Sequence, residues 1–264
     1  MAATVSNVGK QSQLKKAEAF RCLHIPGNPL VLYNVWDAGS AQAVANAGAK
    51  AIATSSWAVA KAHGFEDGER IPFELAIQNL RRIVGAVDLP VTVDLERGYG
   101  DGPEKVAKSI SIAIEAGAIG CNLEDTVPVT LEVRDTETQV DRIHSARKTA
   151  DSTGIPFFIN ARCDLFFYGG DSVPHDDELL AKVVDRAHAY AQAGANGLFV
   201  PGLATISLIS QLAKKSPIPL NILVDSRASV QILADNGVSR ISYGATPYVE
   251  MFSGLEKAAR ASYG

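Results

Sequence analysis

The sequence predicts a single α/β domain that spans residues 1–264 and folds as a (β/α)8 TIM barrel. Short apolar runs alternate with amphipathic stretches along the whole chain, and eight such runs can be counted. Alternating strands and helices imply parallel pairing through right-handed crossovers. A closed barrel of eight such units commonly uses about 250 residues as one domain, so the length fits as well. An open doubly wound sheet is the alternative architecture.

A recurring joint marks where helices end and strands begin. Ala-Gly-Ala occurs at 47–49, 116–118 and 193–195, and Asn-Gly-Val occurs at 236–238, each directly before an apolar run. Glycine supplies the left-handed turn that ends a helix. The predicted strands are 30–34, 50–54, 90–95, 118–123, 156–161, 196–200, 219–224 and 238–243. The predicted helices lie near 39–48, 73–87, 103–116, 136–152, 176–193, 205–215, 227–236 and 246–260, and an extra N-terminal helix near 12–23 is expected to cap the bottom of the barrel.

The composition excludes several classes of protein. The net charge is -4 and no basic stripe is present to neutralise phosphates, so we expect no nucleic-acid partner. No run approaches the roughly 18 apolar residues of a membrane span, so we expect no membrane partner. The 3 cysteines are widely spaced without a CxxC motif, which favours free thiols in a reducing compartment, and the N-terminus lacks the apolar core of a secretory signal. We therefore expect a cytoplasmic protein.

Acidic residues stand where two neighbouring predicted strands end. Asp94 and Glu96 close the run LPVTVDLERGYGDGP, and Glu124 and Asp125 close GAIGCNLEDT. Asp94 and Glu96 are two residues apart on one strand, so they project to the same side. Buried carboxylates repel one another and lose hydration, so folding alone would rarely gather three of them. A divalent cation with oxygen ligands removes that cost, and Mg²⁺ is the commonest candidate.

Two further groups at the strand ends suit an anionic substrate. Arg162 ends the fifth strand, where a guanidinium could hold a substrate carboxylate by two hydrogen bonds; the alternative is that it only neutralises Glu124. Ser55, Ser56 and Trp57 follow the second strand, where backbone N–H groups could hold an oxyanion; an ordinary loop is the alternative. A serine hydrolase is not indicated, because no GxSxG motif is present.

Together these residues resemble the isocitrate lyase / phosphoenolpyruvate mutase superfamily. The resemblance is carried, in order, by NVWDAGSAQAVANAGAKAIATSSW, GFEDG, PVTVDLERGYG, GCNLED, INARCD and RISYG. It implies Mg²⁺, or Mn²⁺, bound by Asp94, with the waters of the metal held by Asp67, Glu96 and Glu124. It also implies a cradle for a 2-oxo acid at Ser55, Ser56 and Trp57, and a carboxylate contact at Arg162. Asp67 enters through the resemblance alone; with Glu124 and Arg162 it is a catalytic candidate.

The chemistry that the resemblance implies is formation of an enolate from a bound 2-oxo or 2-hydroxy acid. A C–C bond breaks in the lyases and decarboxylases, and a P–C bond breaks in the mutase and the hydrolase; the loop after the fourth strand selects between them. The lyases carry Lys-Lys/Arg-Cys-Gly-His there, with the cysteine as the catalytic acid, whereas this chain has TVPVTLEVRDTETQ. The Lys and Asn of the mutase have no match either. Arg134 and Asp135 are the polar candidates that remain in this loop.

Other positions also depart from the superfamily pattern. Glu96 replaces the commoner Asp, Arg97 stands where a small residue is usual, and Pro201-Gly202 stand where many members place a polar contact. The chain looks most like the short phosphonomutase-like branch.

We predict a Mg²⁺-dependent enzyme that cleaves a C–C bond in a small carboxylic acid. P–C cleavage is the first alternative, and a non-catalytic barrel that binds a 2-oxo acid is the second. Superfamily members commonly form tetramers by exchanging a C-terminal helix, so we expect a homodimer or homotetramer, in which such an exchange is an option.

Overall fold

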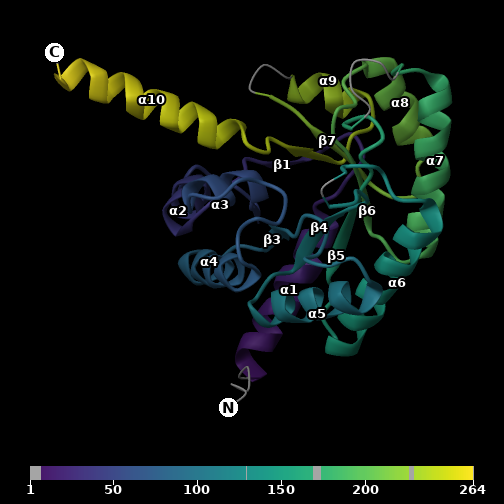
Figure 1. Ribbon diagram of the computed structural model, residues 1–264, viewed down its shortest axis with the longest axis horizontal. Coiled ribbons are helices and arrows are strands. Elements are labelled where there is room, and N and C mark those ends of the chain that lie inside the picture. The colour runs from purple at the N-terminus through teal and green to yellow at the C-terminus, as the bar shows by residue number, and fades with distance from the viewer. Residues whose placement is uncertain (1–6, 129, 169–173, 226–228, 264) are drawn as a thin grey trace.

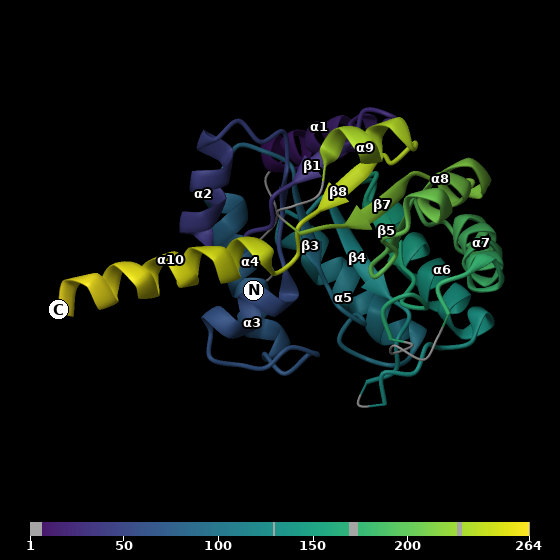
Figure 2. The same cartoon turned by 90° about the horizontal axis from the view of Figure 1, so that it is seen from above.

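Eight parallel strands alternate with helices in a nearly closed barrel (Figures 1 and 2), which confirms the predicted TIM barrel. The structure is a computed structural model that describes residues 7–128, 130–168, 174–225 and 229–263. The strands are β1 (Leu30–Leu32), β2 (Ile52–Ala53), β3 (Val91–Asp94), β4 (Gly120–Glu124), β5 (Phe158–Arg162), β6 (Gly197–Val200), β7 (Leu220–Leu223) and β8 (Arg240–Ser242).

The helices surround these strands (Figure 2). They are α1 (Asn7–Cys22), α2 (Ala38–Asn46), α3 (Ser56–Ala62), α4 (Phe73–Ala86), α5 (Pro103–Glu115), α6 (Thr136–Thr153), α7 (Asp177–Gln192), α8 (Ile206–Lys215), α9 (Val230–Asp235) and α10 (Thr246–Tyr263). The predicted helix near 227–236 corresponds to α9; its first two predicted residues lie outside the described residues. No helix of the described chain is long and apolar enough to cross a membrane.

The barrel closes just beyond the ends of its first two strands. The paired strands run in the order β1-β8-β7-β6-β5-β4-β3-β2, which leaves β1 and β2 at the two edges. An isolated parallel bridge joins Val35 to Thr54 across that gap. Val35 N donates to Ala53 O at 2.9 Å, and Ser55 N donates to Val35 O at 3.0 Å. These bonds bring the two edges together, so the open doubly wound alternative is wrong.

The two faces of the strands bury different kinds of side chain. The residues in the apolar core include Val93, Cys121, Ile159, Ile222 and Ile241, which pack with the helix layer. Because side chains alternate along a strand, their neighbours point into the barrel. Those inward neighbours are polar and buried: Thr92, Asn122, Asn160, Asn221 and Arg240. The centre of the barrel therefore contains a polar layer below the carboxyl ends of the strands.

The N-terminal helix covers the amino ends of the strands, as predicted. Phe20 in the last turn of α1 and His24, two residues beyond this helix, pack on Phe158, the first residue of β5, with ring centroids 5.5 and 4.1 Å away. Gln13 donates to the carbonyl oxygens of Ile114 and Ala118 at 2.8 and 2.9 Å. Hydrogen bonds and aromatic packing thus attach α1 to the bottom of the barrel.

One short helix was not predicted. Ser56 and Trp57, expected in a loop, form the first turn of α3, and Ser55 caps this helix by accepting from Ala58 N at 3.4 Å. The helix has 7 residues, which is too short to show an amphipathic repeat in the sequence.

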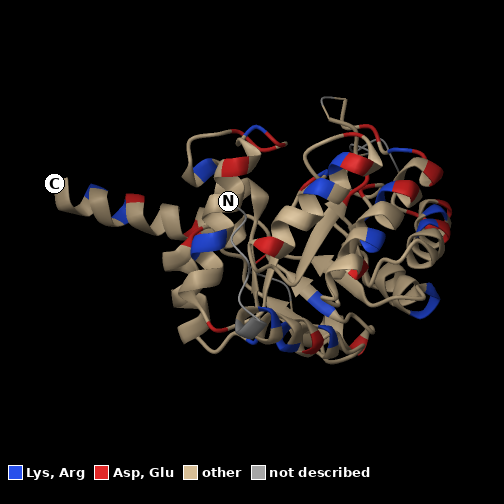
Figure 3. Cartoon of the chain, turned by 90° about the horizontal axis from the view of Figure 1, so that it is seen from below, with Lys and Arg blue, Asp and Glu red and all other residues tan. Residues whose placement is uncertain are grey.

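The C-terminal helix α10 projects away from the barrel (Figure 1). Of its residues only Pro247 is buried, and Val249, Phe252 and Leu255 are 52, 40 and 58% exposed. In a TIM barrel the helices form a ring around the strands, so a projecting last helix leaves strand surface uncovered. Val31 and Tyr33, on the outer face of the first strand segment, are accordingly 36 and 40% exposed. Lys, Arg, Asp and Glu are interspersed over the outer helices seen in Figure 3.

Candidate active site

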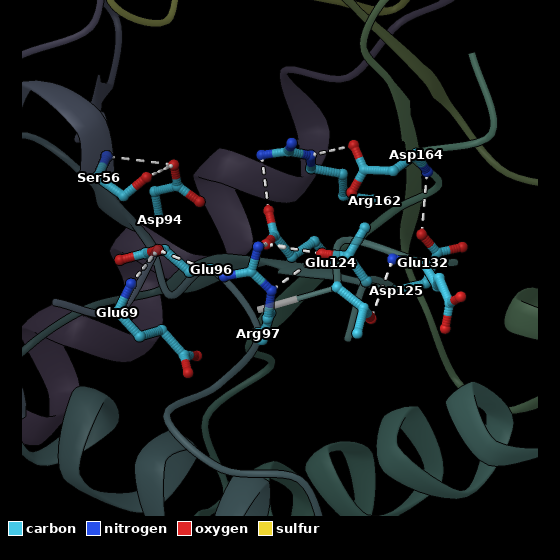
Figure 4. Close-up of polar contacts among 12 residues, drawn as sticks. Ser56, Glu69, Asp94, Glu96, Arg97, Glu124, Asp125, Glu132, Arg162 and Asp164 are labelled. Atoms are coloured by element: carbon cyan, nitrogen blue, oxygen red, sulfur yellow. Dashed lines mark hydrogen bonds and ion pairs between the residues drawn. The ribbon is translucent and has the colours of Figure 1, made fainter. Parts of the chain in front are cut away.

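Four carboxylates meet at the carboxyl ends of the strands. Asp94 and Glu124 end β3 and β4, and Glu96 lies two residues beyond the end of β3; Figure 4 shows all three close together. Asp67 lies in the connection between α3 and α4. Burial raises the pKa of Asp67, and the negative charges of Asp94 and Glu124 raise it further. The structure therefore places Asp67 beside the acids that were recognised from the strand ends.

Asp94 lies at the centre of this group and is held by two neighbouring segments. Its Oδ2 accepts from Ser56 N at 3.2 Å and from Ser56 Oγ at 2.8 Å. On the other side, Asn122 Nδ2 lies 3.5 Å from Oδ1. Backbone position is fixed as well, because Asp94 N donates to Thr54 Oγ1 at 2.9 Å. The first turn of α3 thus orients the carboxylate of Asp94.

The three residues predicted to cradle a 2-oxo acid have different contacts in the structure. Ser55 caps α3, Ser56 binds Asp94, and Trp57 packs edge-on against Tyr248 with ring centroids 5.8 Å apart. Ser55 is the N-cap of α3, and Ser56 and Trp57 form the first turn of this helix at the mouth of the barrel. Their contact with a substrate stays a prediction.

Glu96 is a buried carboxylate in an unusual backbone conformation. Its φ is 49°, in the left-handed region, and the residue is 3% exposed. Oε2 accepts from Glu69 N at 2.6 Å, whereas Oε1 has no hydrogen-bond partner among the described residues. Burial raises the pKa of Glu96 to about 9, with further contributions from the charges of Asp67, Asp94 and Glu124. A positive ion near this carboxylate would stabilise its ionised form.

Glu124 is held between two arginines (Figure 4). Arg97 Nη2 lies 3.2 Å from its Oε1, and Arg162 Nη1 lies 2.8 Å from its Oε2. Thr126 completes the arrangement: its hydroxyl donates to Glu124 Oε1 at 3.1 Å and accepts from Arg97 Nε at 3.0 Å. Arg97 is 2% exposed, so its charge acts without solvent screening. In the sequence, Arg97 is visible only as a departure from the family pattern, and its position directly after Glu96 is the signal that could have identified it.

Arg162 faces the acids from β5 and keeps one nitrogen uncommitted. Its Nε donates to Asp164 Oδ1 at 2.8 Å and its Nη1 pairs with Glu124. No residue of the described chain is hydrogen-bonded to Nη2. The rings of Phe167 and Phe199 lie 5.3 and 5.9 Å from the guanidinium carbon. The alternative role of Arg162, neutralisation of Glu124, is therefore observed, and its contact with a substrate carboxylate stays a prediction.

Two further buried acids, Asp125 and Asp164, lie next to Arg162, and Asp164 accepts its hydrogen bond. Asp125 accepts from Asp164 N at 2.9 Å and from the hydroxyl of Tyr190 at 2.8 Å. Arg186 contacts Asp125 at 3.2 Å and donates to Arg134 O at 2.6 Å, which ties the loop after β4 to α7. Burial raises the pKa of Asp164 to about 8. These contacts fix the loop that was predicted to select the reaction.

The two polar residues proposed for that loop have structural contacts. Arg134 pairs with Asp101 at 2.8 Å, and Asp135 caps α6 by accepting from Thr138 N at 2.8 Å. Neither contact places a proton donor at the acids. The part of the loop around residue 129 lies outside the described residues.

The residues at the mouth fit a hard cation bound mainly through water. Within the described ranges, no three His, Cys, Asp or Glu side chains converge closely enough to hold a metal ion directly. Mg²⁺, however, usually keeps several waters and takes one or two carboxylates from the protein. Asp94 would supply a central oxygen ligand, and the buried Oε1 of Glu96 has no hydrogen-bond partner within the described residues. This donor set fits Mg²⁺ or Mn²⁺ with Asp94 as the direct ligand, as the resemblance implied.

The chain resembles known proteins over nearly its whole length. The family model described as phosphoenolpyruvate phosphomutase matches residues 20–262. A crystal structure from Burkholderia cenocepacia J2315, provisionally described as a phosphonomutase, is 50% identical with a TM-score of 0.92, covering 95% of this chain and 99% of that chain. The uncharacterized protein Rv1998c of Mycobacterium tuberculosis is 31% identical, over 92% of this chain and 88% of its own length.

Two more distant proteins have described activities or ligands. The 2-methylisocitrate lyase of Escherichia coli is 29% identical over 77% of this chain and 68% of its own length. A phosphonopyruvate hydrolase, whose crystal structure contains oxalate and Mg²⁺, has a TM-score of 0.79 at 21% identity, covering 94% of this chain and 87% of that chain. At that identity the likeness shows the fold.

In the absence of divalent metal, the protein should lose stability as the pH rises from about 5 to about 9. The pKa of Glu96 in the folded protein, about 9, lies above its ordinary value of 4.5, so over this range the folded chain keeps a proton that the unfolded chain has released. Glu96 alone lowers the free energy of unfolding by at most about 1.4 kcal/mol for each unit of pH increase. Glu96→Gln should remove this part of the slope in urea unfolding series with EDTA.

The control for this experiment is Glu74→Gln, which changes an exposed carboxylate on α4 and should keep the slope. Asp164, with its pKa raised to about 8, adds to the slope in all three proteins equally. Parallel stability curves for Glu96→Gln and the unmodified protein would contradict the buried, proton-holding state of Glu96.

Proposed function

The chain belongs to the phosphoenolpyruvate phosphomutase family, and on that premise we propose that it is a Mg²⁺-dependent enzyme that cleaves a C–C bond in a small 2-oxo or 2-hydroxy carboxylic acid. The superfamily contains Mg²⁺-dependent lyases and mutases. The observation that carries the proposal is the pairing of an acid cluster around Asp94 with the guanidinium of Arg162 at one barrel mouth. The first group suits a cation and the second suits a carboxylate.

The proposed mechanism assigns a separate task to each group. Asp94 would hold Mg²⁺ directly, and Asp67, Glu96 and Glu124 would hold its waters. When bound, the ion supplies stabilisation of the negative charge that develops on a substrate oxygen. Arg162 Nη2 would bind the substrate carboxylate.

Arg97 places a buried positive charge 3.2 Å from Glu124 Oε1 and so holds this carboxylate in position. The loop 126–135 contains neither Cys nor His, so protonation of the enolate is assigned to water.

C–C cleavage is preferred because 2-methylisocitrate lyases are among the relatives of this chain. P–C cleavage, by a mutase or a hydrolase, is the alternative that the provisional description of the Burkholderia structure favours. A barrel that only binds a 2-oxo acid is the other alternative, supported by the lack of an acid in the loop after β4. The three cysteines are free thiols, which supports a reducing, cytoplasmic location.

A turnover screen by mass spectrometry should show EDTA-sensitive cleavage of at least one acid. The panel contains oxaloacetate, 2-methylisocitrate, isocitrate, dimethylmalate, phosphonopyruvate and phosphoenolpyruvate, each with Mg²⁺ and with EDTA. A C–C product supports the main proposal, and a P–C product supports the first alternative. No turnover, together with Mg²⁺-dependent binding of oxalate, would contradict catalysis on this panel and favour the binding barrel.

Asp94→Ala should abolish Mg²⁺-dependent turnover and Mg²⁺-dependent oxalate binding, because the only direct carboxylate ligand is lost. Circular dichroism should show a folded protein, since Asp94 is at the mouth and outside the apolar core. The matched control is Asp88→Ala, an aspartate whose side chain is 98% exposed, which should keep both properties. Metal-dependent activity in Asp94→Ala equal to that of the control would refute the assignment.

We also propose that the protein assembles as a homodimer or homotetramer in which α10 of one copy covers β1 of another. Apolar side chains are exposed on both surfaces: Val249, Phe252 and Leu255 on α10, and Val31 and Tyr33 near β1. A groove of about 420 Å³ that includes Val31 and Tyr33 lies beside β1. A second copy would bury these residues together.

Replacing Leu255 with Asp should therefore lower the molar mass measured by light scattering to that of the monomer, since a charge would have to be buried in an apolar contact. The control is Lys257→Asp, which introduces the same side chain two residues further along α10 and changes the net charge by two units rather than one. An unmodified protein that is monomeric at high concentration would contradict the assembly.

A further inference from the structure

Arg240 is a buried cation inside the barrel for which the proposed mechanism has no task. It begins β8, is 1% exposed, and projects into the polar layer below the acids. Among the described residues it forms no ion pair. Moving an unpaired guanidinium out of water costs several kcal/mol, and an apolar residue of similar volume often serves folding as well or better. Stability alone therefore does not account for an arginine at position 240, and its contacts indicate another role.

The contacts of Arg240 lead to one amide. Its Nη2 donates to Asn122 Oδ1 at 3.2 Å, and its Nε contacts Ser242 Oγ at 3.4 Å. Nη1 has no hydrogen-bond partner in the described chain. Asn122 Oδ1 also accepts from Asn160 Nδ2 at 2.9 Å. Two donors, from β8 and β5, thus converge on the oxygen of the Asn122 side chain.

That convergence decides which way the amide of Asn122 faces. An amide has one acceptor and one donor end, and the ends cannot exchange while two donors occupy the oxygen. The NH2 end must then point to the opposite side, where it lies 3.5 Å from Asp94 Oδ1. Ser56 already holds Asp94 Oδ2, so the two oxygens of the central carboxylate are held from opposite sides.

We propose that Arg240 is a positioning residue of the metal site, which acts through Asn122 to orient the carboxylate of Asp94. This inference deepens the proposed function and rests on it. Arg240 touches neither substrate nor metal in this scheme. Burial lowers its pKa to about 9 and the charge of Asp94 raises it, so the guanidinium remains charged at neutral pH.

The affinity for Mn²⁺ separates this role from a purely electrostatic one. If Arg240 were only a nearby positive charge, its removal would strengthen binding of a cation, because a repulsive term disappears. If it orients Asp94, its removal should weaken cation binding. Loss of partners that orient metal ligands typically weakens metal binding by about 10- to 100-fold. The two roles therefore predict opposite signs.

The experiment measures the dissociation constant for Mn²⁺ by electron paramagnetic resonance, together with the melting temperature. Arg240→Met should weaken Mn²⁺ binding about tenfold without lowering the melting temperature, because a buried unpaired ion is replaced by an apolar side chain. Arg240→Gln keeps a donor for Asn122 and should bind Mn²⁺ more tightly than Arg240→Met. If Arg240→Met does not fold, Asn122→Ala is compared with the unmodified protein, and equal or tighter Mn²⁺ binding in that variant would overturn the inference.

Two further variants test the route through Asn122. In an Asn122→Ala background, Arg240→Met should have little additional effect on Mn²⁺ binding, since the intermediary is already lost. The control is Arg147→Met, which removes a partly buried arginine that bonds Phe157 O and Asn196 outside the site and should leave Mn²⁺ binding unchanged.

Unchanged or tighter binding in Arg240→Met would overturn the inference and leave the proposed function intact. Absence of Mn²⁺ binding by the unmodified protein would overturn the proposed function and the inference with it.

Discussion

Mutual repulsion among four clustered carboxylates, of which Glu96 and Glu124 are buried, is the constraint on which the candidate site depends. Asp67, Asp94, Glu96 and Glu124 lie at one barrel mouth, and burial together with their shared negative charge raises the pKa of Asp67 and Glu96. Two arginines offset part of this repulsion by holding Glu124 from both sides. The remaining excess of negative charge is what a divalent cation would neutralise. The negative charge at the barrel mouth therefore affects both the stability of the fold and the binding of a cation.

The scaffold holds these acids by elements that meet only in the folded chain. Asp94 is bound by the first turn of α3 and faces an amide on β4, while Glu96 accepts a hydrogen bond from Glu69 in the loop that carries Asp67. Arg186 on α7 connects the loop after β4 to Asp125. Because loops on this face determine specificity in barrels of this class, such ties limit the shapes that the mouth can adopt.

The interior of the barrel adds a polar support below the site. Most of the stability comes from the apolar layer between strands and helices, which needs no polar interior. The buried amides and Arg240 instead form a hydrogen-bonded chain that ends at Asp94. A partly satisfied polar network is costly in a barrel core, so its value lies in the geometry that it imposes on the carboxylate.

The barrel, its eight strands, the helix at its base and the positions of the acids and Arg162 at the strand ends could all be predicted from the amino-acid sequence. Local signals carry this information: a repeated glycine joint, apolar runs, and charged residues where those runs stop. The sequence could not reveal α3, whose 7 residues leave no periodic pattern, or the pairing of Arg97 with Glu124. Asp67 was found through family resemblance, because its loop reaches the acids only by tertiary folding. Only the tertiary structure showed that Arg240 and Asn122, 118 residues apart, share one hydrogen bond, since the strands β4 and β8 meet only across the interior of the closed barrel.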